Sequence, residues 1–126
     1  MENITGVQHI GMPVDDSAAT VAFYAQLGFS IAYETLNGTE RVAFLKKGDL
    51  VIETYENHQA ALCDGAWDHI ALDVVDIHKA WKEIVEGLGI PSIEGSIQTL
   101  PFWKSGVKFF TVQGPNREKI EFSQVL

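Results

Sequence analysis

The stretch Val7-Gln8-His9-Ile10-Gly11-Met12-Pro13-Val14 occurs a second time, in altered form, as Trp67-Asp68-His69-Ile70-Ala71-Leu72-Asp73-Val74. Each copy carries His-Ile at the same place, and each has the alternating pattern of a β-strand. A second pair of matching dipeptides, Ile52-Glu53 and Ile120-Glu121, lies near the end of each half. The chain therefore reads as a duplicated module in which each copy contributes one histidine and one glutamate.

A helix is predicted after each of the two strands. Helix-capping oxygens are available from Asp15, Asp16 and Ser17 in the first half and from Asp76 in the second. Apolar residues then recur at helical spacing until a glycine ends the pattern. They are Val21, Tyr24 and Leu27 before Gly28, and Ile77, Ala80, Trp81, Ile84, Val85 and Leu88 before Gly89.

Three further runs in each half are rich in β-branched and aromatic residues, which favours strands. They cover 29–34, 41–46 and 50–55 in the first half, and 93–99, 107–112 and 119–123 in the second. Each half is thus β-α-β-β-β, and we expect an α+β fold of two βαβββ modules in a pseudo-twofold arrangement. The expected modules cover approximately 4–57 and 66–126, within a single domain 1–126.

Length, charge and cysteine content limit the kinds of partner and function that the protein can have. A chain of 126 residues can bury a core without a structural metal, so any metal here is expected to be functional. The formal charge of −8 with few basic clusters argues against nucleic acid and anionic membranes as partners, which leaves a small molecule or a second copy of the chain. Cys63 is the single cysteine, the N-terminus lacks a leader pattern, and no run approaches the roughly 18 apolar residues of a membrane span. We expect a cytoplasmic protein.

The alternation of side chains along each strand places the four repeated residues on one side of the sheet. His9 and His69 lie opposite the aliphatic face that a helix would cover, and so do Glu53 and Glu121. All four can project from the open, concave face of a curved sheet. Unpaired carboxylates would be costly there, which favours metal binding over a purely structural role. Two imidazoles and two carboxylates suit Zn²⁺, Ni²⁺, Co²⁺, Mn²⁺ or Fe²⁺, and the spacing does not choose among them.

Residues for substrate contact are expected around this face. Tyr55 and Trp67 share the parity of Glu53 and His69, as pocket walls or as residues covered by a partner. The apolar loop 100–106 lies between two late strands and can close over a substrate, with Trp103 packing on it and Lys104 meeting an anionic group. The alternative is that the aromatic residues of this loop pack at a dimer interface.

Over essentially its whole length the sequence resembles the glyoxalase/bleomycin-resistance/extradiol-dioxygenase superfamily, also called vicinal oxygen chelates. The resemblance rests on four motifs: the His-Ile-Gly-Met-Pro-Val opening, the helix end 23–29, the second strand Asp-His-Ile-Ala-Leu and the ending 114–122. It implies two βαβββ modules that form a metal-binding cleft. In short members this cleft is usually shared between two chains, so a homodimer is implied.

In the glyoxalase I (lactoylglutathione lyase) branch, the metal is held by one His and one Glu from each module. By resemblance these ligands are His9, Glu53, His69 and Glu121 here. That branch converts the hemithioacetal of methylglyoxal and glutathione into a lactoyl thioester, by proton transfer through a metal-stabilised enediolate. The resemblance implies Glu121 as the catalytic base and Glu53 as its symmetric counterpart.

Two further positions bear on which thiol the substrate carries. Glutathione-using members have an arginine shortly after the first histidine, where this chain has Pro13. Asn57, in contrast, matches a family position that contacts the glutamyl part of the thiol. The substrate implied is therefore a hemithioacetal of an unspecified thiol, or a related small α-oxo compound.

Other functions within the same superfamily remain open. Dioxygenases and thiol transferases that act on drugs generally use two His and one Glu, so the fourth ligand, Glu53, counts against them. Binding proteins of the bleomycin-resistance type sequester a drug and have typically lost the ligands, although one with a residual metal site is possible. Epimerases that act next to a thioester use a similar metal site, often with Gln at the position of Glu53.

Overall fold

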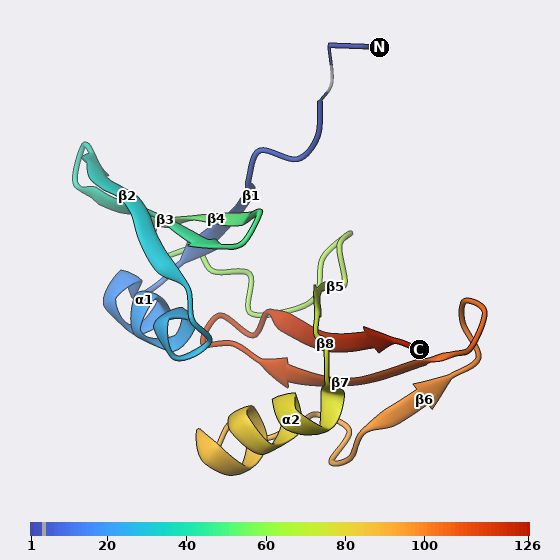
Figure 1. The fold of residues 1–126 in the computed structure, drawn as a ribbon. Helices are drawn as coiled ribbons and strands as arrows, with labels where there is room; N and C mark the ends of the chain where they lie inside the picture. Colours follow the sequence, from blue (N-terminus) through green and yellow to red (C-terminus); the bar gives the residue numbers. More distant parts are fainter. Residues whose placement is uncertain (4) are drawn as a thin grey trace. The chain divides into compact units, whose positions relative to one another are not determined.

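The computed structural model describes residues 1–3 and 5–126. It consists of two compact units, Met1–Ala60 and Ala61–Leu126. Each unit contains one four-stranded sheet and one helical segment (Figure 1). Ile4, where the first module is expected to begin, lies outside the described residues. In the part of the chain that is described, no helix is long and apolar enough to cross a membrane.

The two units have the same topology. The elements of the first are β1 (Ile10–Val14), α1 (Ser17–Gln26), β2 (Ser30–Asn37), β3 (Glu40–Lys47) and β4 (Leu50–Glu56). Those of the second are β5 (His69–Asp73), α2 (Ile77–Trp81), the π-helix η1 (Lys82–Gly87), β6 (Gln98–Leu100), β7 (Val107–Gln113) and β8 (Lys119–Val125). The sheet orders are β1-β4-β3-β2 and β5-β8-β7-β6, and in each sheet the first two strands are parallel and the others antiparallel. The predicted α+β class with two βαβββ modules is confirmed.

The helix of the first unit begins and ends where the sequence predicts. The Asp16 carboxylate caps it by accepting a hydrogen bond from the Ala19 N–H at 2.9 Å. After its last turn Gly28 has a φ of +87°, a conformation that glycine adopts without steric cost. Within the unit, α1 buries Tyr24 against the sheet, where its ring meets Phe29 edge-on at 5.2 Å.

The helix of the second unit departs from the predicted pattern in its second half. Asp76 caps it as expected, but after Trp81 the chain continues as a π-helix, with the Leu88 N–H bonded to the Glu83 carbonyl. Because a π turn takes more residues than an α turn, the apolar stripe rotates relative to the sheet. Leu88, predicted to lie in the stripe, is 41% exposed. Ile84, earlier in the stripe, stays buried.

The sixth strand is shorter than predicted. The prediction covers 93–99, whereas β6 is Gln98–Leu100, and only an isolated bridge from Ser92 to Val112 precedes it. Gly95 has a φ of +78°, which interrupts an extended strand. The composition of the segment therefore predicts a longer strand than the one that forms, because a turn within the segment breaks the pairing with β7.

Alternation along the long strands separates a covered face from an open face in each unit. On β4, Ile52 and Thr54 are buried, while Glu53 between them is half-buried. On β8, Ile120 and Phe122 are buried around the half-buried Glu121. The core of each unit therefore lies between its sheet and its helix, and the glutamates project from the opposite face.

Candidate metal centre

The first unit brings His9 and Glu53 into contact. Glu53 lies in the middle of β4, directly beside Gly11 of the parallel strand β1. His9 comes two residues before Gly11, one residue ahead of the strand, and so lies on the same face. Its Nε2 is 2.9 Å from Glu53 Oε2, and the two side chains are 33% and 26% exposed. The pair is therefore accessible without being fully solvated.

The second unit repeats this arrangement with His69 and Glu121. Glu121 of β8 lies beside Ala71 of β5, and His69 is the first residue of that strand. His69 Nε2 is 3.3 Å from Glu121 Oε2, with side-chain exposures of 42% and 18%. Each unit thus presents one imidazole nitrogen and one carboxylate oxygen at equivalent positions of its sheet.

The spacing of these donor atoms fits a metal ion. When metal–ligand bonds are about 2.1 Å long, neighbouring ligand atoms of one tetrahedral or octahedral ion lie about 3.0–3.4 Å apart. The two His–Glu separations, 2.9 and 3.3 Å, are close to this range. Within residues 1–3 and 5–126 no three His, Cys, Asp or Glu side chains converge as ligands, so each unit offers two donors. Two donors are fewer than a divalent ion usually takes from a protein.

The second ring nitrogen of each histidine has a different partner. His9 Nδ1 lies 3.0 Å from Gln8 Oε1, whereas His69 Nδ1 lies 2.8 Å from Asp68 Oδ2. Lys119 lies 3.3 Å from Asp68 and 2.8 Å from Asp64. Hydrogen bonds from His69 and Lys119 hold the pKa of Asp68 below its ordinary value, and those to Asp64 and Asp68 raise the pKa of Lys119. These partners leave both Nε2 atoms facing the glutamates.

Aromatic rings border the pair of the first unit. Phe44 lies opposite Glu53 in the β3–β4 ladder, and its ring meets that of His9 edge-on at 5.6 Å. Tyr33 on β2 pairs with Phe44, with ring centroids 6.2 Å apart. The Tyr55 ring lies over Gly11, at ordinary contact distance from where a Cβ would be. Tyr55 therefore lies beside Gly11 on the same face of the sheet as Glu53.

The other predicted substrate residues have local contacts of their own. Asn57 follows β4, and its side-chain oxygen accepts a hydrogen bond from the Gln59 N–H. Trp67 precedes β5 and is 89% exposed, so it packs against little of its own unit. Trp103, with a φ of +61°, and Lys104 line a hollow of 400 Å³ formed by the loop between β6 and β7. The structure thus assembles the two His–Glu pairs, and the part of these side chains in substrate binding stays a prediction.

Several residues around the pairs were missed from the sequence. Phe44 has the open-face parity of Glu53, but its position beside that residue depends on the strand register. Asp68 and Gln8 precede the histidines directly, yet nothing in the pattern indicates that they contact the rings. Lys119 was detectable in principle, since it stands two residues before Glu121 and shares its face.

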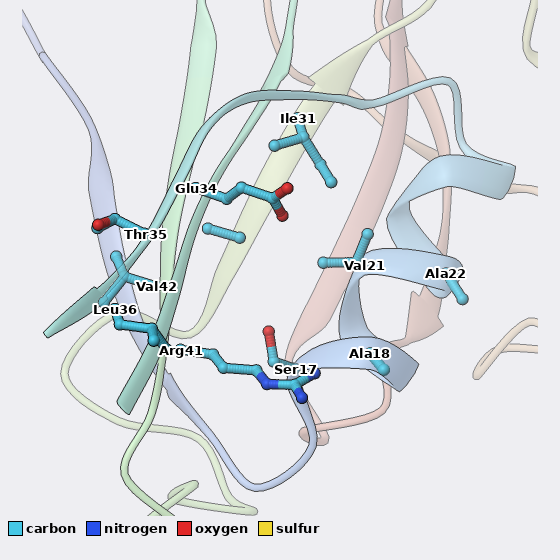
Figure 2. Close-up of a pocket in the computed structure, with 11 residues that line it drawn as sticks. Ser17, Ala18, Val21, Ala22, Ile31, Glu34, Thr35, Leu36, Arg41 and Val42 are labelled. Atoms are coloured by element: carbon cyan, nitrogen blue, oxygen red, sulfur yellow. The ribbon is translucent and has the colours of Figure 1, made fainter. Parts of the chain in front are cut away.

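A separate hollow of 580 Å³ lies on the other side of the first sheet. Figure 2 shows it between α1, which contributes Val21 and Ala22, and the strands β2 and β3, which contribute Ile31, Glu34 and Arg41 among others. None of the predicted site residues lines it. The hollow is mostly apolar and belongs to the helix-covered face, whereas Glu53 projects from the open one.

Comparison with known proteins agrees with this architecture. The sequence model of the glyoxalase/bleomycin resistance protein/dioxygenase superfamily matches residues 6–122. An uncharacterized protein of Bacillus subtilis strain 168, YwbC, is 32% identical over 125 residues, which cover 94% of this chain and 96% of that protein.

Solved structures with different activities share the fold. A lactoylglutathione lyase from Agrobacterium tumefaciens has a TM-score of 0.71 at 19% identity, with 95% of this chain and 93% of that one covered. The fosfomycin resistance protein FosX from Listeria monocytogenes has a TM-score of 0.73 at 17% identity, with 98% and 95% covered. At these identities the likeness establishes the fold alone.

Because the family model covers almost all of the sequence and the curated relative almost all of both chains, the protein belongs to the glyoxalase/bleomycin resistance protein/dioxygenase superfamily.

Proposed function

We propose that the protein is a metal-dependent lyase or isomerase of the glyoxalase I type, acting on a hemithioacetal or a related small α-oxo compound. The observation that carries this proposal is the matched pair of contacts, His9 with Glu53 and His69 with Glu121, at equivalent positions of the two units. Four ligands of this kind are more than the two-His, one-Glu set that we expect for a dioxygenase or thiol transferase. A binding protein has no need of an intact set.

The chemical roles follow from the donor types. A divalent transition ion, when bound by the four side chains, would supply Lewis-acid stabilisation of negative charge on the oxygens of an enediolate. Glu121 is the proposed base, which takes the proton from one carbon of the substrate and returns it to the neighbouring carbon. Its side chain is 18% exposed, the most shielded of the four, which suits a carboxylate that must hold a proton away from water. Glu53 is its counterpart in the first unit.

The thiol part of the substrate is proposed to differ from glutathione. Pro13 replaces the arginine expected in glutathione-using members, and a proline side chain cannot pair with a carboxylate. The Phe44 ring beside His9, and the Tyr33 ring beside Phe44, offer apolar contact instead. We therefore expect thiols without a γ-glutamyl carboxylate to serve at least as well as glutathione.

Metal content of the purified protein is the first test. Elemental mass spectrometry after reconstitution with Ni²⁺, Zn²⁺ or Co²⁺ should find about one ion per four-ligand site. The variants H69A and E121A should lose the ion, while H78A, which removes an exposed histidine of α2, should keep it. Thioester formation from methylglyoxal with a panel of thiols then tests the reaction. A wild-type protein that takes up no ion would refute the lyase and leave a binding protein of the bleomycin-resistance type.

We also propose a homodimer in which each site takes one His–Glu pair from each chain. Two complementary variants test this: a chain carrying H9A and E53A, and a chain carrying H69A and E121A. Neither alone should hold an ion. If sites are shared between chains, refolding an equal mixture should restore about a quarter of the wild-type metal content, because half of the dimers are then mixed and each has one intact site. No recovery in a demonstrably mixed dimer would place both pairs of a site on one chain.

A further inference from the structure

The two proposed histidine ligands differ in the group behind them. Nδ1 of His9 contacts the neutral amide of Gln8, whereas Nδ1 of His69 contacts the carboxylate of Asp68. In other respects the two pairs match, since each histidine faces its glutamate through Nε2. The two modules therefore share the atoms that would bind a metal, but they differ in the residue that contacts Nδ1 of the histidine.

Asp68 is itself held in place. Lys119 stands directly opposite His69 in the β5–β8 ladder, and its ammonium group contacts both Asp68 and Asp64. Lys119 contacts one oxygen of the Asp68 carboxylate, and the other oxygen accepts the hydrogen bond from His69 Nδ1 at 2.8 Å. In the described part of the first unit, His9 has no comparable arrangement, since its Nδ1 contacts the side-chain amide of Gln8.

A hydrogen-bonded carboxylate changes a ligating imidazole in two ways. It fixes the proton on Nδ1, so that Nε2 is free to bind the ion, and it raises the electron density of the ring. An amide oxygen also fixes the proton on Nδ1, but it raises the electron density of the ring only a little, because it carries no net charge. Outer partners of this kind are commonly worth about 10–100-fold in metal affinity.

We propose that Asp68, steadied by Lys119, is a positioning residue that makes His69 the stronger of the two imidazole ligands. The inference rests on the proposed metal site and adds to it an asymmetry between the two modules. The alternative is that Asp68, Lys119 and Asp64 form only a surface ion-pair cluster. Such clusters contribute little to stability, so the alternative predicts little effect of these residues on either metal binding or folding.

Two reciprocal substitutions that preserve side-chain size separate these possibilities. D68N replaces the carboxylate behind His69 by an amide, and Q8E replaces the amide behind His9 by a carboxylate. Zn²⁺ and Co²⁺ affinities are measured by competition with a chromophoric chelator. We expect D68N to bind about 10–100-fold more weakly than wild type and Q8E to bind more tightly. Unfolding midpoints of the metal-free proteins should stay unchanged, because the substituted side chains are exposed.

A control and a spectroscopic readout accompany the affinities. D64N removes one partner of Lys119 and one negative charge from the same cluster without touching His69, so it should weaken binding only a few-fold. In the Co²⁺-loaded protein, proton NMR should show shifted, exchangeable Nδ1–H signals from both ligating rings. D68N should make one of the two signals exchange with water faster and leave the other unchanged, and Q8E should alter only that other signal.

The outcomes distinguish this inference from the proposed function. Equal affinities in wild type, D68N and Q8E would overturn the inference while the metal site stands. Equal losses in D68N and D64N would also overturn it, because general attraction of the cation by negative charge would then suffice. A wild-type protein without any metal affinity would overturn the proposed function first, and the inference with it.

Discussion

Glu94 completes the pairing of β7 where its neighbouring strand has ended. The ladder between β6 and β7 covers only Val107 to Phe109, so the N–H of Thr111, a buried residue, has no strand partner on that side. Glu94 accepts a hydrogen bond from this N–H at 2.8 Å and another from the Ser92 hydroxyl at 2.9 Å. We predict that these bonds stabilise the second unit, in a manner that depends on pH.

The magnitude follows from what each substitution leaves behind. E94A leaves a buried backbone donor without a partner, which costs about 2 kcal/mol. E94Q keeps one acceptor oxygen and loses the charge, so about 1 kcal/mol is expected at neutral pH. Partial burial raises the pKa of Glu94, but hydrogen bonds from Thr111 and Ser92 outweigh this and bring the pKa below its ordinary value.

The sign of the pH dependence follows from that lowered pKa. The stabilisation by the charged form is fully present above the pKa of Glu94 in the unfolded chain and is lost as the pH falls through the folded value. Urea unfolding of wild type and E94Q, followed from neutral pH into acid, should therefore show a gap that is constant near neutrality and closes in acid. Equal stability at neutral pH, or a gap that widens in acid, would refute the reasoning.

Three further outcomes are expected. Replacing Phe110, which packs between the rings of Trp81 and Phe122 and is fully buried, by Ala should cost about 3–5 kcal/mol in the free energy of unfolding measured in urea. D76A removes the cap of α2, whose carboxylate accepts from two backbone N–H groups, and should lower that free energy by about 1 kcal/mol, with helical circular dichroism retained at low temperature. A chelator should leave the protein folded, because the core of each unit contains no ligand residue; loss of cooperative thermal unfolding after metal removal would contradict this.

The strand faces could be predicted from the sequence because alternation in a strand is a local property. Glu53 and Glu121 emerge between buried neighbours as their parity requires, and the capping aspartates Asp16 and Asp76 begin their helices. The predictions that failed depended on departures from regular backbone geometry. Leu88 turns outward because η1 changes the helical period, which no spacing of apolar residues reveals.

The surroundings of the candidate ligands were harder to predict than the ligands themselves. Phe44 reaches His9 only through the register of β3 on β4, and register is set by the whole sheet. The roles of Gln8 and Asp68 depend on side-chain rotamers next to the histidines, for which the sequence carries no periodic signal. Trp67 lies before β5 begins, so its place beside a substrate stays a prediction.

The close approach of His9 Nε2 to Glu53 has a consequence for how an ion enters. An imidazole nitrogen and a carboxylate oxygen 2.9 Å apart are within hydrogen-bond distance, and such a bond needs a proton on the nitrogen. The same holds for His69 and Glu121. A metal ion that bound these donors would have to replace that proton, so metal affinity should fall in acid. In the metal-free protein, the same hydrogen bond would keep each imidazole and its carboxylate at the spacing that the proposed metal site needs.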